Sequence, residues 1–170
     1  GVITPENLVG ATFVARFNNV GSWSIQLPYG DRLGEVLRQP GAGIIVTGPN
    51  GDVILSGPTL TARLEQTQDN PDGDWLIEGA TDSILLSERL AYPTPSTADV
   101  TLQTDGFDVR NGPAETVIKQ YVDVNLGPNA ATGRSAFGVT IETNLGRGNT
   151  VFANARFDSV QELIYDLAQV

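Results

Sequence analysis

The chain has 170 residues, 40% of them hydrophobic and 18% charged, so it can bury a core and is not disordered as a whole. Twenty acidic residues against ten basic ones give a net charge of −10 with no cluster of cations, so we expect no specific nucleic-acid binding. The chain contains no cysteine and no histidine, which removes thiol nucleophiles, the imidazole base and nearly all structural zinc chemistry.

Residues 11–27 predict a β-hairpin. Trp23 and the apolar residues two and four positions after it alternate with polar residues, which is the period of a half-buried strand. Phe13 and Phe17 alternate in the same sense on the preceding segment. The Asn-Asn-Val-Gly stretch between the two segments supplies residues that tolerate a tight turn. We therefore expect Trp23 to lie in a hydrophobic core.

Residues 33–37 predict a short helical turn, and residues 43–58 predict a second β-hairpin. Its turn is the Pro-Asn-Gly-Asp stretch at residues 49–52, where Asn-Gly gives the backbone twist that matches paired strands. Apolar runs flank this turn on both sides, which strengthens the prediction.

The next strand is expected over residues 59–65, where Leu60 and Leu64 alternate with polar residues. The acidic stretch at residues 69–74 then turns the chain into a further strand over residues 75–80. Strand after strand at short spacing predicts a closed or nearly closed antiparallel sheet.

The pattern changes after residue 80. Residues 82–92 predict one to two helical turns that end before Pro93. The segment that follows is rich in proline and threonine and is the expected subdomain boundary. The sequence thus predicts an α+β fold with mostly antiparallel strands, in which a barrel-like module over residues 1–97 precedes an α+β module over residues 98–170.

A helix is expected over residues 113–125, because Pro113 suits the first helical position and an apolar stripe follows at helical spacing. This stripe consists of Val117, Ile118, Tyr121 and Val122. After a long loop, residues 139–144 and 149–157 predict two further strands or extended segments.

A last helix is expected to begin at Ser159, which has capping-box spacing to Glu162. Its apolar face comprises Val160, Leu163, Ile164 and Leu167. This face stops with the chain, and the first residue is not methionine, so we expect a trimmed piece of a longer protein whose second module is truncated and whose last helix has lost part of its packing partner. The sequence shows no secretory signal and no apolar run of the roughly 20 residues that a membrane span needs, so we expect no membrane insertion.

Three patterns that could carry chemistry have simpler interpretations. The acidic stretch at residues 69–74 lacks the regular oxygen ligands and closing glutamate of a calcium loop, and is interpreted as an acidic turn. The glycine-containing stretch at residues 145–150 matches no phosphate-binding loop and is interpreted as a hairpin turn. Paired carboxylates could hydrolyse glycosides, but among twenty acidic residues a close pair is expected by chance.

Aromatic side chains could stack on a sugar, and Trp23, Trp75 and Tyr92 are the candidates. The two tryptophans lie in alternating strand patterns, which favours a role in the core, whereas Tyr92 lies near a turn and is ambiguous. We therefore expect no catalytic, cofactor-binding or metal-binding residues, no cofactor and no enzymatic activity.

Five stretches of the chain occur together in an order typical of one protein family. They are FNNVGSWSIQLP, GAGIIV with GDVILSGP, WLIEGATDSILLSERLAYP, AETVIKQYVDVNLGP and ARFDSVQELIYDLA. In this order the chain resembles the minor tail proteins of long-tailed phages that infect actinobacteria, which are similar to the tail-hub (baseplate-hub) proteins of contractile phages. The resemblance covers nearly the whole chain and rests on sequence phrases, not on catalytic motifs.

The resemblance implies a structural virion protein of the phage tail tip. It implies a barrel-like module that continues the tail tube, then an inserted α+β module, arranged as a trimeric ring that joins the tube to the tip. The implied partners are copies of the chain itself and other tail proteins, and the implied location is the virion tail, assembled in the cytoplasm of the bacterial host. Such hubs are longer than this chain, so a second barrel and any C-terminal activity would lie outside it.

Two other functional classes stay open. A carbohydrate-binding or receptor-binding β module would be supported by exposed aromatic rings near Trp75 and Tyr92. A cell-wall hydrolase would require two carboxylates held at the correct separation.

Overall fold

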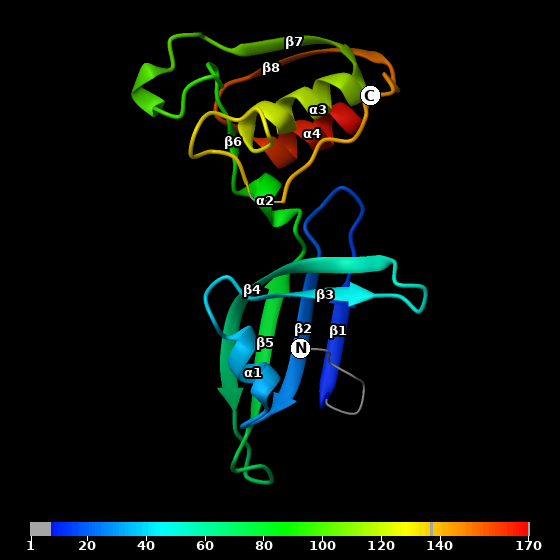
Figure 1. Cartoon of the computed structure of the whole chain (residues 1–170), viewed down its shortest axis with the longest axis vertical. Coiled ribbons are helices and arrows are strands. Elements are labelled where there is room, and N and C mark those ends of the chain that lie inside the picture. Colours follow the sequence, from blue (N-terminus) through cyan, green and yellow to red (C-terminus); the bar gives the residue numbers. More distant parts are fainter. Residues whose placement is uncertain (1–7, 137, 170) are drawn as a thin grey trace. The chain divides into compact units, whose positions relative to one another are not determined.

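The computed structural model describes residues 8–136 and 138–169, which form two compact units that divide between Ile84 and Leu85 (Figure 1). The fold is α+β with mostly antiparallel strands, as the sequence predicts. The sequence pattern suggested a boundary after residue 97. In the structure the division comes earlier, because β6 (Leu90–Ala91) pairs with β9 (Asp158–Ser159) and so joins the C-terminal half.

The first unit is a five-stranded antiparallel sheet that curls into a half-barrel (Figure 1). Its strands follow the order β1 (Gly10–Val14), β2 (Ser22–Pro28), β5 (Asp74–Ala80), β4 (Val53–Glu65) and β3 (Gly43–Thr47). Strand β4 changes partners halfway, because its first half pairs with β3 and its second half pairs with β5. The register shifts between Thr59 and Thr61, and such an irregularity bends a strand, so this is the corner at which the sheet curls.

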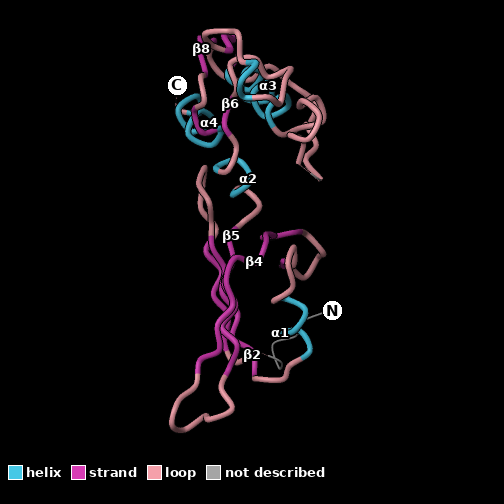
Figure 2. The backbone as a smooth tube through the Cα atoms, turned by 90° about the vertical axis from the view of Figure 1, so that its left-hand side faces the viewer, coloured by secondary structure: helices cyan, strands magenta, loops and turns pink. Residues whose placement is uncertain are grey.

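The core of the first unit lies on one face of this sheet. Every second residue of β2 is buried, which confirms the predicted alternation. The buried core residues are Trp23, Ile25, Leu27, Leu37, Leu55 and Ile77. Leu37 comes from the short helix α1 (Arg32–Leu37), which packs against β2 and β5 and lies beside the sheet in Figure 2.

Trp23 is the largest side chain of this core, with 2% of its surface exposed. Its indole Nε1 donates a hydrogen bond to the Ala80 carbonyl oxygen at 3.1 Å. The ring lies against Gly79, where a Cβ atom would come within 2.2 Å of Trp23 Cε2. The prediction that Trp23 is a core residue is confirmed, and a glycine is required beside it.

Four apolar side chains predicted on buried faces are exposed, and Phe13, on the edge strand β1, is one of them at 43%. Phe17 is 91% exposed because it belongs to the turn after β1, where the alternation of the strand does not apply. Leu60 is 54% exposed and lies at the irregularity in β4, which interrupts the alternation there. Leu64, near the end of the same strand, is 37% exposed.

The second unit packs two helices against a two-stranded sheet (Figure 1). The helices are α3 (Ala114–Asn125) and α4 (Val160–Ala168), and the sheet pairs β7 (Asp108–Pro113) with β8 (Thr150–Ala155). The remaining short elements are α2 (Ile84–Ser87) at the division and the 3₁₀ helix η2 (Val100–Leu102). Val117 and Tyr121 of α3 are fully buried, which confirms the predicted stripe of this helix.

The apolar face of α4 packs within its own unit. Val160 and Leu167 are buried, and Leu163 and Ile164 pack against the same core. The expectation that this face lacks part of its partner is therefore wrong for Val160 and Leu167, and it stays a prediction for the half-buried Leu163 and Ile164. Ser159 occupies the N-cap position, but its side chain makes no capping hydrogen bond, so the capping box does not form.

One predicted strand is absent, and three observed strands, β6, β7 and β9, were not expected. Residues 139–144 form no strand, whereas Thr150–Ala155 does, as predicted. Its partner β7 was not predicted, because Asp-Val-Arg-Asn-Gly-Pro has the composition of a turn. The long-range pairing with β8 overrides that local preference.

Candidate functional site

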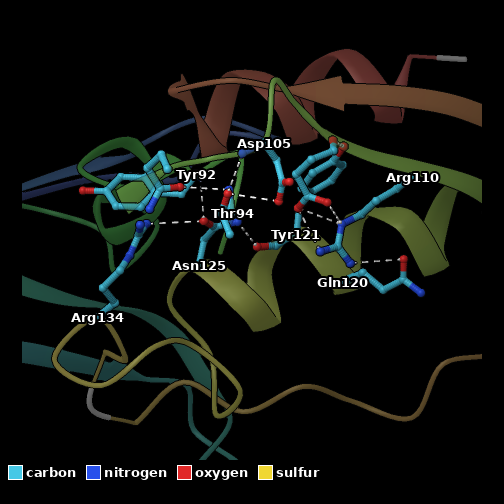
Figure 3. A network of polar contacts seen from close by, with 10 residues as sticks. Tyr92, Thr94, Asp105, Arg110, Gln120, Tyr121, Asn125 and Arg134 are labelled. Atoms are coloured by element: carbon cyan, nitrogen blue, oxygen red, sulfur yellow. Dashed lines mark hydrogen bonds and ion pairs between the residues drawn. The ribbon is translucent and has the colours of Figure 1, made fainter. Parts of the chain in front are cut away.

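A buried polar network lies in the second unit around Asn125, the last residue of α3 (Figure 3). The Asn125 side chain is fully buried. Its Oδ1 accepts hydrogen bonds from the Tyr92 backbone N–H at 3.0 Å and from Arg134 Nη2 at 3.3 Å. Its Nδ2 donates to the Tyr121 carbonyl oxygen at 2.9 Å. One amide thus ties the end of α3 to the segment after β6 and to the loop that follows the helix.

Arg134 places a guanidinium group inside the second unit, where only 7% of the residue is exposed. Nη2 also donates to the Leu90 carbonyl oxygen at 2.6 Å, and the guanidinium carbon lies 3.3 Å from the centroid of the Tyr92 ring. Burial lowers the pKa of Arg134 because it disfavours the charged form. The aromatic face and the carbonyl oxygen offset part of that desolvation, while Nη1 is buried without a hydrogen-bond partner among the described residues.

The network continues along α3 to the strand β7. Tyr121 Oη donates to the Asp108 carbonyl oxygen at 2.8 Å. Burial raises the pKa of Tyr121 to about 12, and the nearby Asp108 carboxylate acts in the same direction. Arg110 donates from Nε to both Asp108 carboxylate oxygens, at 3.1 and 3.0 Å, and its guanidinium carbon lies 4.9 Å from the Tyr121 ring centroid. These contacts fix β7 on the helix.

A second cluster forms around Glu115 in the first turn of α3. Its carboxylate accepts hydrogen bonds from the backbone N–H, Nε and Nη2 of Arg147, at 2.9 to 3.1 Å, and from Lys119 Nζ at 2.8 Å. The bonds from Arg147 and then Lys119 hold the pKa of Glu115 well below its usual range. The cluster ties the loop before β8 to the start of α3.

The bonds between Glu115 and Arg147 indicate a structural role for the glycine-containing stretch at residues 145–150. Gly146 and Gly148 have φ angles of +67° and +88°, so the stretch does turn sharply. It is a loop rather than the predicted hairpin turn, because no strand precedes it. Its cation, Arg147, donates from Nε and Nη2 to the Glu115 carboxylate at 3.0 and 3.1 Å, so its charge is paired within the protein.

The acidic stretch at residues 69–74 forms the predicted turn, here between β4 and β5. The backbone N–H of Gly73 donates to the carbonyl oxygen and to Oδ1 of Asn70, at 3.2 and 3.1 Å, and Gly73 has a φ of +80°. Within residues 8–136 and 138–169, no three acidic side chains are grouped so that they could hold a metal ion.

The three aromatic candidates make contacts within the protein. Trp75 lies at the edge of the first core, with the Arg38 guanidinium carbon 3.9 Å from its ring centroid and the Tyr29 ring stacked at 6.4 Å. Tyr92 lies against Arg134 and meets the Phe157 ring edge-on at 5.4 Å. Together with the burial of Trp23, these contacts favour structural roles for all three rings.

The edges of the first sheet form a surface that no sequence motif marks. Within the part of the chain that the structure describes, strands β1 and β3 end the sheet, so each pairs on one side only. Neither strand contains a charged residue or a proline, the two devices that commonly protect an edge. Four of the five residues of β1 are exposed, and Ile45 in β3 is 71% exposed. The lack of charged residues in both strands is the sequence feature that could have indicated edges open to pairing.

Comparison with known families finds a match over residues 4–170 to the family described as Siphovirus ReqiPepy6 Gp37-like protein. Comparison with curated proteins finds no match. In the part of the chain that the structure describes, no helix is both long enough and apolar enough to cross a membrane.

Proposed function

The chain belongs to the Siphovirus ReqiPepy6 Gp37-like protein family and is therefore a protein of long-tailed phages; we propose that it is a tail-hub component of the virion, which assembles into a ring between the tail tube and the tail tip. The proposed ring is a trimer, its other partners are further tail proteins, and the proposed host is an actinobacterium. Assembly takes place in the host cytoplasm.

The observation that carries this proposal is the pair of open, uncharged edges on the first sheet. An edge strand presents a row of unpaired N–H and C=O groups, which pair readily with a strand of another chain. A ring in which β1 of one copy pairs with β3 of the next would use both edges of every copy. Such head-to-tail contacts close into a ring when the rotation between copies allows it.

The side-chain chemistry supports an assembly role without catalysis. Glu115, Tyr121 and Arg134, whose pKa values are shifted, are engaged in bonds that hold one segment of the second unit to another. The chain has no histidine or cysteine to act as base or nucleophile. We therefore propose that this part of the protein has neither an enzymatic activity nor a cofactor.

Light scattering on the full-length protein, together with electron microscopy of assembled tails, tests the proposal. A trimer in solution, or a threefold ring at the tail tip, is the expected result. Replacing Ile45 by Lys places a charge on the β3 edge and should abolish the ring, whereas Tyr165→Lys, at an exposed position of α4, should not. A protein that stays monomeric in both experiments and releases sugars from cell walls would contradict the proposal and favour the hydrolase, and specific signals in a glycan-binding screen would favour the carbohydrate-binding module.

A further inference from the structure

The outer face of the two-stranded sheet in the second unit carries exposed apolar side chains. In β8, Val151, Ala153 and Ala155 are buried, so the residues between them point away from the helices. Figure 1 shows β7 and β8 side by side along α3 and α4, which cover the other face. We call the outward residues Val109 and Asn111 of β7 and Phe152 and Asn154 of β8 the ribbon face, and we include Phe107 and Arg156, which lie just outside the strand ends and contact each other there.

The strand register brings these side chains together on one surface. Val109 is paired with Asn154, and Asn111 with Phe152. Val109 and Phe152 are therefore diagonal neighbours, about 7–8 Å apart in such a ladder and within reach of each other through the phenyl ring. Val109 is 56% exposed and Phe152 is 71% exposed, so this strip faces water. A phenylalanine exposed to that degree on a regular strand, beside a second exposed apolar residue, is typical of a contact surface.

The ribbon face carries no carboxylate, although the chain has a net charge of −10. Its one charged side chain is Arg156, whose guanidinium carbon lies 5.9 Å from the centroid of the Phe107 ring. Asp108 of the same sheet is 11% exposed in its side chain and forms an ion pair with Arg110 at 2.8 Å. The face thus combines an apolar strip with one cation at its end, where the Asp158 carboxylate beside it accepts a hydrogen bond from the Arg156 backbone N–H at 2.7 Å.

We propose that the ribbon face is the docking surface for another tail protein, one that presents an apolar surface bordered by carboxylates. The apolar part matches the strip of Val109 and Phe152, and a carboxylate at its border matches Arg156. The inference rests on the proposed function, because it requires the chain to be part of an assembled tail.

A second copy of the chain fits this face less well. Two ribbon faces in contact would form a closed twofold pair, which differs from the head-to-tail contacts of the proposed ring. Six residues of strand at about 3.3 Å each and two strands about 5 Å apart give a face of roughly 200 Å². This is well below the roughly 800 Å² per partner of a stable interface, so the partner must reach beyond the ribbon or be held by several copies at once.

Contacts within the second unit hold the ribbon face in one conformation before any partner binds. Tyr121 Oη holds the Asp108 carbonyl oxygen at 2.8 Å, and the Arg110–Asp108 pair holds the strand that carries Val109. Little conformational freedom is then lost on binding, which favours association on a small area.

A photo-cross-linking experiment in assembled tails tests this inference. The reactive residue p-benzoylphenylalanine replaces Phe152 in the full-length protein, and a matched variant carries it at Tyr165 of α4, which is 47% exposed. We expect position 152, and not position 165, to cross-link to a different tail protein that mass spectrometry identifies. Adding Arg156→Glu to the position-152 variant should lower the yield at least several-fold, since a carboxylate would then face the border of the partner.

The outcomes of the cross-linking experiment distinguish a failure of the ribbon-face proposal from a failure of the proposed function. A cross-link from position 152 to a second copy, a cross-link to the chain's own residues, or equal yields at both positions would overturn the ribbon-face proposal. Absence of any cross-link in tails that contain the protein would also overturn it. Absence of the protein from purified tails would instead contradict the proposed function, so the two failures are distinguishable.

Discussion

Replacement of Asn125 by Leu should destabilise the second unit by about 2.5–4 kcal/mol. The change keeps the side-chain size but removes the acceptor for the Tyr92 N–H and for Arg134 Nη2. Leaving a backbone donor without its partner costs about 1–3 kcal/mol, and losing a bond to a charged group costs about 1.5–3 kcal/mol. The lower part of both ranges applies, because Tyr92 is half-buried and Arg134 Nη2 keeps its bond to the Leu90 carbonyl oxygen.

Chemical unfolding followed by two probes measures this effect. Both tryptophans, Trp23 and Trp75, lie in the first unit, so tryptophan fluorescence follows that unit. Hydrogen exchange of peptides from residues 85–170 follows the second unit. Asn129→Ala is the matched control, because Asn129 is exposed and bonds the Asp123 carboxylate at the surface. This control should change stability by no more than about 0.5 kcal/mol.

The coupling between the two polar groups gives a stricter test. If Asn125 acts by satisfying the guanidinium of Arg134, the double variant Asn125→Leu with Arg134→Leu should lose less stability than the sum of the two single variants. Strict additivity, or an Asn125→Leu protein that unfolds at the midpoint of the parent, would refute the account of this network.

Three further perturbations have expected outcomes. Trp23→Ala should cost about 3–5 kcal/mol in the free energy of unfolding of the first unit, and Trp23→Phe less, as measured by urea midpoints. Folding raises the pKa of Tyr121 from 10.0 to about 12, so its contribution to the free energy of unfolding is complete below pH 10 and is lost as the pH rises towards 12. In the Tyr121→Phe variant, thermal melts should therefore show a smaller loss of stability at alkaline pH. Folding lowers the pKa of Glu115 from 4.5, so its contribution to the free energy of unfolding is complete above that pH and is lost as the pH falls below it. The Glu115→Gln variant should therefore lose less stability at acid pH than the parent. It should also exchange amide hydrogens faster in residues 139–149 at neutral pH.

The elements that the sequence predicted well are those with a local signal. The alternation around Trp23 and the Asn-Gly turn at residues 49–52 depend on neighbouring residues, and both hairpins are present. The stripe of α3 follows from helical spacing and is also present. Strands β6 and β9 have two residues each and pair across more than sixty positions, so no local pattern announces them.

The polar network was only partly predictable. Asn125 follows Val117 and Tyr121 at steps of four residues, so helical spacing places it on the buried stripe and marks it as a buried amide. Arg134 lies in an irregular loop and bonds Leu90, which is distant in sequence. Nothing in the composition of that loop separates a buried arginine from an exposed one, and only the tertiary packing decides it.

Salt should act in opposite directions on the two contacts proposed for this protein. Copies with a net charge of −10 repel one another, while the β1 and β3 edges carry no charge of their own. Raising the salt concentration from 0.1 M to 1 M shortens the screening length from about 10 Å to about 3 Å, which removes most of that repulsion. Ring formation by the full-length protein should therefore increase with salt in sedimentation experiments. Docking on the ribbon face depends in part on Arg156 and a carboxylate, so its cross-link yield should fall over the same range. A ring that dissociates as salt rises would show that ion pairs, not the uncharged edges, hold the copies together.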